Sequence, residues 1–117
     1  MSRELGNIAE DAAAAALEGA GYTILERNYF ARVGEIDIIA MDDGVICFVE
    51  VKKRAYETFG GGAAAITKSK ITKILKSARR YLYEKKLLDK DYRLDAVIIS
   101  GEGVPQIIRN IYTEGMA

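Results

Sequence analysis

The stretch that decides the fold is residues 35–54, which read Glu35-Ile-Asp-Ile-Ile-Ala-Met-Asp-Asp-Gly-Val-Ile-Cys-Phe-Val-Glu-Val-Lys-Lys-Arg54. Two runs rich in β-branched residues flank Asp43-Gly44, a dipeptide that favours the two-residue type I′ turn of a β-hairpin. A turn at these positions places Asp37 directly opposite Glu50. The stretch therefore predicts an antiparallel hairpin that carries two facing acids.

The two faces of this hairpin differ in composition, because side chains alternate along a strand. One face is apolar and is expected to turn toward the core: Ile36, Ile38, Ala40, Cys47, Val49 and Val51. The other face carries charged residues at its open end: Glu35, Asp37, Glu50 and Lys52. The charges are therefore expected to converge on half of one face.

Facing carboxylates have Cβ atoms about 4.5–5.5 Å apart and destabilise a sheet unless a proton, a cation or a metal ion compensates them. Magnesium suits such a site, because it accepts one or two carboxylates and leaves positions for water and phosphate oxygens. Lys52 follows Glu50 on the same face, where an amine can orient or deprotonate an attacking water. The alternative is an exposed Glu50–Lys52 salt bridge worth about 0–1 kcal/mol.

The rest of the chain predicts two helices and three more strands around this hairpin. We expect a helix over residues 4–18, a strand over 22–29 and a second helix over 67–87 that begins at Thr67. Two strands are expected over 94–100 and 106–113. The predicted fold is a single α/β domain over residues 1–117, with an αβββαββ order and a mixed sheet flanked by helices.

Composition excludes several kinds of chemistry. The 117 residues contain no histidine and one cysteine, Cys47, so imidazole catalysis, internal disulfides and cysteine-rich metal sites are excluded for a monomer. Carboxylates, lysines and hydroxyls remain as catalytic groups. No apolar stretch approaches the roughly 18 residues of a membrane span. We therefore expect a soluble cytoplasmic protein without a membrane partner.

Charge is unevenly distributed although the net charge is zero. Residues 1–51 carry a net −7, residues 52–86 a net +9 and residues 87–117 a net −2. Clustered cations bind phosphates, so the middle segment suggests a nucleic acid partner. The candidate nucleic-acid-binding residues lie on the exposed side of the second helix: Lys68, Lys73, Lys76, Arg79 and Arg80. A solvated helix face is the alternative interpretation.

Several separated motifs match one family in order along nearly the whole chain. They are Gly6-x-x-x-Glu10-Asp-x-Ala13, Gly21-Tyr22-x-Ile24-Leu25-x-Arg27-Asn28, Gly34-Glu-Ile-Asp37, Phe48-Val-Glu50-Val-Lys52-Lys-Arg54, Phe59-Gly60, Lys70, Ala78-x-x-Tyr81-Leu82 and Arg93-Leu-Asp95. The chain resembles the YraN-like family of small bacterial proteins. That family is classed with the PD-(D/E)XK nuclease superfamily and is similar to Holliday-junction resolvases. The resemblance implies a restriction-endonuclease-like core.

The resemblance also implies roles for individual residues. Asp37, Glu50 and the Val51 carbonyl would hold Mg²⁺ or Mn²⁺, and Lys52 would be the catalytic lysine. Glu10 would reach the site from the first helix, and Lys70 would supply a further cation. Arg93 and Asp95 match too, although a structural salt bridge accounts for them equally well.

The expected activity is metal-dependent hydrolysis of phosphodiester bonds in DNA. A non-catalytic nucleic-acid-binding or accessory module that retains the nuclease fold remains the principal alternative. A protein–protein adaptor is a further one. Superfamily enzymes that act on two strands or on junctions are often dimers, so a homodimer is also open.

Overall fold

The described residues form seven helices and strands in the predicted αβββαββ order. The computed structural model describes residues 2–54, 66–100 and 104–112, and Phe59-Gly60 of the matched motifs therefore lies outside the described residues. The elements are α1 (Ser2–Gly19), β1 (Thr23–Ala31), β2 (Gly34–Asp42), β3 (Val45–Arg54), α2 (Lys68–Glu84), β4 (Tyr92–Ser100) and β5 (Gln106–Ile108). The mixed α/β fold is confirmed.

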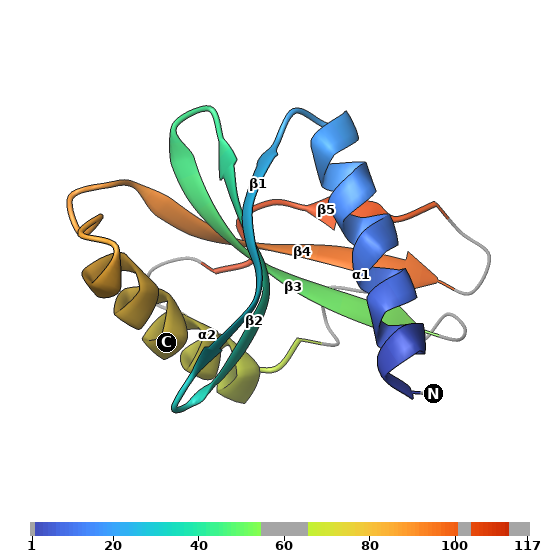
Figure 1. Ribbon diagram of the computed structural model, residues 1–117, viewed down its shortest axis with the longest axis horizontal. Coiled ribbons are helices and arrows are strands. Elements are labelled where there is room, and N and C mark those ends of the chain that lie inside the picture. Colours follow the sequence, from blue (N-terminus) through green and yellow to red (C-terminus); the bar gives the residue numbers. More distant parts are fainter. Residues whose placement is uncertain (1, 55–65, 101–103, 113–117) are drawn as a thin grey trace.

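The five strands form one sheet in the order β1-β2-β3-β4-β5. β3 and β4 are parallel, whereas the other neighbouring strands are antiparallel. The parallel pair needs a crossover connection, and α2 lies in that connection. Figure 1 shows α1 and α2 on opposite sides of the sheet, so that each face has its own helix.

The predicted hairpin turn is confirmed. Asp43 and Gly44 have φ angles of +51° and +82°, and a type I′ turn requires positive φ at both positions. β2 and β3 then pair in the predicted register from Asp42–Val45 to Ile38–Val49. The Asp-Gly dipeptide therefore sets the register of the central strands.

The predicted position of Ile36 is wrong. Ile36 packs with Ile39 on the α2 side of the sheet, whereas Ile38 packs on the α1 side. Simple alternation fails here because the strands become irregular around Asp37. The neighbouring β1 residue, Asn28, has a φ of +55°, and backbone pairing between β2 and β3 stops at Ile38.

Each helix covers a separate hydrophobic cluster. The apolar stripe of α2 is buried as predicted: Ile71, Ile74, Leu75, Ala78, Tyr81 and Leu82. Thr67 caps α2 and accepts a hydrogen bond from the Lys70 amide at 3.1 Å. On the other face, Cys47 lies fully buried among residues that contact α1.

Among the described residues, neither helix combines the length and apolarity needed to cross a bilayer.

The last strand is shorter than predicted. It ends at Ile108 instead of continuing over 109–112, and residue 113 is outside the described ranges. The Asn110 amide donates to the side chain of Asp95 at 2.8 Å, and the Ile111 amide donates to the Leu94 carbonyl at 2.7 Å. Asn110 also has a φ of +58°, which is incompatible with a regular strand.

Candidate active site

Asp37 lies where the backbone pairing of β2 and β3 stops. The last paired residues are Ile38 and Val49, so the predicted Asp37–Glu50 step is not a regular ladder pair. Instead, the Val51 amide donates a hydrogen bond to Asp37 Oδ2 at 2.8 Å. The carboxylate thus takes the place of a strand carbonyl and lies in the gap between the two strands.

Glu50 faces this gap with one oxygen unpaired. Its side chain is 11% exposed, and Oε2 lies 3.6 Å from Lys70 Nζ. Oε1 is buried and has no hydrogen-bond partner among the described residues. Burial, followed by the adjacent Asp37 carboxylate, raises the pKa of Glu50 to about 7, although Lys70 opposes the increase. Glu50 therefore lacks full compensation in its ionised form.

The pKa of Asp37 is also raised. Burial is the main cause, and the Val51 N–H opposes it. Glu10 raises this pKa further through its charge, whereas Lys70 lowers it. Two neighbouring acids, each with a raised pKa, are typical of a site that takes up a proton or a cation.

Glu50 and Asp37 line cavities on different sides of the sheet. Glu50 and Lys52 line a cavity of about 260 Å³, together with Ile66, Thr67 and Lys70 at the start of α2. Asp37 lines a cavity of about 200 Å³, together with Ala9, Glu10, Val51 and Lys53. The expectation that Asp37 shares a face with Lys52 is therefore wrong, because the irregularity around Asp37 turns its side chain into the gap.

Glu10 reaches the site from α1, and two residues of β1 hold it there. Glu10 is buried and accepts hydrogen bonds from Arg27 Nε and Nη2, both at 3.2 Å. Asn28 Nδ2 donates to the same oxygen at 3.0 Å. The left-handed backbone of Asn28 places both donors on the α1 side. Arg27 also bonds Asp11 at 2.6 Å, which fixes the guanidinium against the helix.

The donor atoms around the gap fit a hard divalent cation. Asp37 and Glu50 supply carboxylate oxygens, and the buried Oε1 of Glu50 is available. A strand residue directs its N–H and C=O toward the same neighbouring strand, so the Val51 carbonyl faces the gap with its amide. Within the described ranges there is no group of three or more acidic, histidine or cysteine side chains suited to a metal. Two carboxylates, a carbonyl and water match magnesium, which keeps several waters.

Three residues at the site had no predicted role. Lys53 lines the Asp37 cavity, and alternation from Lys52 could have placed it on that face. Arg27 and Asn28 orient Glu10, and no sequence signal shows the positive φ that directs them there. Glu35 was predicted nearby. Its pKa is raised by burial, then by Asp37 and Glu10.

The cations predicted to bind nucleic acid lie on α2. All five are exposed: Lys68, Lys73, Lys76, Arg79 and Arg80. Arg80 is engaged by Glu84 at 2.8 Å, one turn farther along the helix. Lys70 lies on one flank of this basic face, between α2 and Glu50. The basic face of α2 therefore begins directly beside the gap between β2 and β3 that holds Asp37 and Glu50, called the acidic gap below.

Arg93 and Asp95 form a separate ionic network on the α1 side of the sheet. Asp95 is fully buried and bonds Arg93 at 3.0 Å and the Tyr22 hydroxyl at 2.7 Å. Arg93 also pairs with Asp42. The side chain of Asp95 thus has donors on both oxygens, which supports the structural interpretation of this pair.

Comparison with known proteins identifies the family. Residues 9–99 match the family described as "Uncharacterised protein family UPF0102". A UPF0102 protein from Sulfurihydrogenibium sp. is 48% identical over 99 residues, which cover 85% of this chain and 86% of that protein. A relative from Neisseria gonorrhoeae is 43% identical, with coverage of 95% and 96%. One from Desulforapulum autotrophicum is 43% identical, with coverage of 96% and 95%. The chain therefore belongs to the UPF0102 family, the YraN-like family that its motifs resemble.

Proposed function

We propose that this protein is a metal-dependent endonuclease that hydrolyses phosphodiester bonds in DNA. The observation that carries the proposal is the buried Oε1 of Glu50, which lies beside the Asp37 carboxylate and has no hydrogen-bond partner among the described residues. Such a pair is unfavourable without a cation, and a cation there would lie beside a basic helix. The motif resemblance to PD-(D/E)XK nucleases supports the same assignment.

Asp37, Glu50 and the Val51 carbonyl are the proposed ligands of Mg²⁺ or Mn²⁺. When bound, the metal would lower the pKa of a water and neutralise charge on the phosphate. Asp37 would be oriented for ligation by the Val51 amide, which already holds Oδ2 at 2.8 Å. Glu10 would add negative charge on the α1 side of the gap, fixed by Arg27 and Asn28.

The cavity beside Glu50 has the composition expected for the reacting phosphate. Lys52 and Lys70 bring two cations to it, and Ile66 and Thr67 lead into the first turn of α2. A helix N-terminus also favours an anion, because its amides point outward. In the proposed reaction Lys52 orients or deprotonates the attacking water, and Lys70 stabilises the negative charge that develops on the phosphate.

A cleavage assay with matched variants tests the proposal. Labelled duplex, single-stranded and branched DNA would be incubated with Mg²⁺, with Mn²⁺ and with EDTA. Glu50→Gln and Lys52→Ala should each lower the rate by about a hundredfold or more, because each removes a group that acts on the reacting atoms. Glu18→Gln and Lys90→Ala change exposed charges away from the acidic gap and from α2 and should cleave at the parental rate.

Two outcomes would contradict the proposal. In the first, cleavage survives EDTA or is unchanged by Glu50→Gln, so the observed activity comes from a contaminating nuclease and not from the acidic gap. If no DNA is cleaved and Mg²⁺ does not stabilise the protein, the metal site is wrong.

The exposed basic face of α2 favours the non-catalytic binding module as a second candidate. DNA affinity should then fall steeply with salt, with a log–log slope of about −0.9 for each phosphate contacted on duplex DNA. The triple variant Lys73→Ala, Lys76→Ala, Arg79→Ala should flatten that slope and leave the melting temperature unchanged. If the triple variant binds DNA with the same affinity and the same salt dependence as the parent, the basic side of α2 is only a solvated helix face. Titrating the protein with metal, in the presence and in the absence of DNA, distinguishes the non-catalytic binding module from the metal-dependent enzyme.

A further inference from the structure

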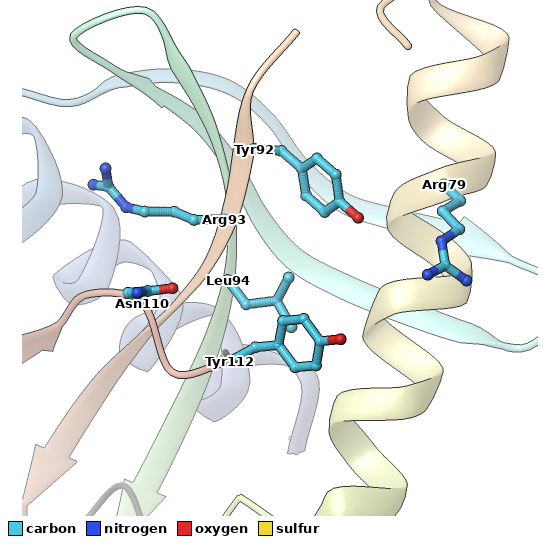
Figure 2. A pocket seen from close by; sticks show the side chains of 6 residues that line it. All are labelled: Arg79, Tyr92, Arg93, Leu94, Asn110 and Tyr112. Atoms are coloured by element: carbon cyan, nitrogen blue, oxygen red, sulfur yellow. The ribbon is translucent and has the colours of Figure 1, made fainter. Parts of the chain in front are cut away.

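A second concave site lies at the other end of α2, away from the acidic gap. Its cavity has a volume of about 380 Å³ and is lined by Arg79, Tyr92, Arg93, Leu94, Asn110 and Tyr112. Figure 2 shows Tyr92 and Tyr112 projecting toward α2 from the same side, with Arg79 reaching from the helix toward them. Two aromatic rings and one guanidinium therefore face the same space.

The aromatic wall is held in place by contacts behind it. The ring of Tyr92 packs edge-on against Phe48, with centroids 5.9 Å apart. The segment carrying Tyr112 is bound to β4 through the Ile111 amide, which donates to the Leu94 carbonyl at 2.7 Å. The Asn110 amide bonds the buried Asp95 at 2.8 Å. Both rings thus stand on backbone that is fixed by the sheet.

The two arginines at this cavity differ in availability. The guanidinium of Arg93 turns away from the tyrosines and is paired with Asp42 and Asp95 (Figure 2). Arg79 is exposed, and it has no ion pair within the described part of the chain. Arg79 is therefore the guanidinium that can bind an anion here, and a phosphate suits its planar fork.

A row of cations connects this cavity with the acidic gap. Lys70, Lys73, Lys76 and Arg79 recur every third residue, and residues at that spacing are neighbours on a helix surface. Lys70 lies 3.6 Å from Glu50 Oε2, and Arg79 lies at the tyrosine cavity. The row therefore runs across the exposed face of α2 from one site to the other.

The offset between the sites follows from the pairing of β3 with β4. Glu50 is beside Ala96 and Ile46 is beside Tyr92, so the offset along the strands is four residues, or about 13 Å. That length equals about four nucleotide steps of 3.4 Å along a strand in a duplex. Along α2, the nine steps from Lys70 to Arg79 rise about 14 Å and make about two and a half turns, so the row winds from one flank of the helix to the other.

We propose that the Arg79–Tyr92–Tyr112 cavity binds an unpaired base of DNA, with its phosphate on Arg79 and its ring stacked on the tyrosines. The strand continues along the row of cations toward Glu50. Aromatic stacking combined with cationic contacts to the backbone is how proteins hold single strands, and a duplex keeps its bases inside. The inference rests on the proposed function and narrows its substrate to DNA with an unpaired segment about four nucleotides from the acidic gap.

A binding measurement without metal tests this inference separately from catalysis. Fluorescence anisotropy in EDTA would compare a blunt duplex with the same duplex carrying a single-stranded oligothymidine extension at either end. The parent should prefer the extended duplex. Tyr112→Leu and Tyr92→Leu should each weaken binding to the extended duplex by about tenfold, the effect of losing one stacked base. Binding to the blunt duplex should not change.

Matched variants separate stacking from loss of fold or charge. Tyr112→Phe and Tyr92→Phe keep the rings and should bind as the parent does. Tyr83→Leu removes an exposed tyrosine of α2 that does not line the cavity and should have no effect. Arg79→Ala should weaken binding to the extended duplex more than Arg80→Ala, because Arg80 is paired with Glu84.

The inference is overturned if the parent binds both DNAs equally, or if the leucine variants lose affinity for both. It is also overturned if Tyr83→Leu matches Tyr112→Leu. Because no metal is present, selective binding can be observed even if Glu50→Gln shows that the acidic gap does not cleave DNA. The failure of one proposal is therefore distinguishable from the failure of the other.

Discussion

The two ionic clusters of this sheet differ in how many partners they supply to a buried acid. Asp95 is fully buried and receives hydrogen bonds from the Tyr22 hydroxyl, the Arg93 guanidinium and the Asn110 amide. Glu50 is almost as buried, yet it has one lysine at 3.6 Å and an oxygen without a partner among the described residues. Both oxygens of Asp95 therefore accept hydrogen bonds, whereas Lys70 alone pairs with Glu50 within the described part of the chain.

This difference distinguishes an acid that supports the fold from an acid that we propose as a metal ligand. An acid whose lone pairs are all filled contributes to the stability of the fold, because its removal leaves donors unpaired. An acid that faces another acid raises the free energy of the folded protein until something binds. The comparison therefore predicts opposite responses to the loss of a carboxylate.

The largest effect is expected at Asp95. Asp95→Ala leaves the Tyr22 hydroxyl and the Asn110 amide without their acceptor and removes one partner of Arg93. The free energy of unfolding should fall by about 3–5 kcal/mol, the usual cost of breaking a buried ion pair on one side. Urea denaturation followed by circular dichroism measures this change. A loss below that of an ordinary surface substitution would show that the network does not support the fold.

Divalent metal should stabilise the parent through the acidic gap. At a free Mg²⁺ or Mn²⁺ concentration a hundredfold above Kd, the gain in unfolding free energy is about 2.7 kcal/mol. Glu50→Gln should abolish it, and Asp42→Asn, which alters the ionic cluster of Asp95, should not. Thermal melts with EDTA and with millimolar metal compare the three proteins. A parent melting curve unmoved by either metal contradicts the proposed site.

The pH dependence of stability should distinguish the two clusters in metal-free buffer. The pKa of Glu50 is raised from 4.5 to about 7 in the folded protein. Between these values the unfolded chain ionises the carboxyl while the folded protein keeps its proton, so the folded state binds more protons. The free energy of unfolding should therefore fall by roughly 2 kcal/mol as pH rises through this window. Denaturation at several pH values should show that Glu50→Gln removes this decline.

The smallest effect is expected for Asp37→Asn. The asparagine oxygen can still accept the hydrogen bond of the Val51 amide, while the repulsion with Glu50 is removed. In EDTA the variant should be at least as stable as the parent, by about 0.5–1 kcal/mol. It should also lose the stabilisation by metal. A clear loss of stability in EDTA would show that Asp37 is a structural ion-pair partner like Asp95.

The fold could be predicted largely because its strongest signals are local. The Asp43-Gly44 turn determined the register of β2 and β3, and the apolar stripe of α2 identified the buried face of that helix. The position of Asp37 could not be predicted in the same way. It depends on the left-handed Asn28 in the neighbouring strand, and no local pattern shows that a strand will become irregular there.

The two sites on α2 also differ in how far sequence reasoning could reach. The acids of the gap lie on one hairpin, so turn geometry brought Asp37 and Glu50 together. The tyrosine cavity joins residues from α2, β4 and the segment after β5. Those segments meet only through the parallel crossover and the bonds of Asn110 and Ile111, so their proximity is a property of the tertiary structure.

The single thiol of Cys47 gives this protein a built-in reporter of strand opening. Cys47 is fully buried in β3, and burial, followed by the charge of Asp95, raises its pKa to about 12. Only the thiolate reacts with a disulfide reagent, so modification must wait until β3 separates from its neighbours. The rate at which Cys47 is labelled therefore reports how often β3, the strand that carries Glu50, opens. An ion or a DNA strand that binds across β2 and β3 would slow this reaction even where no product is formed.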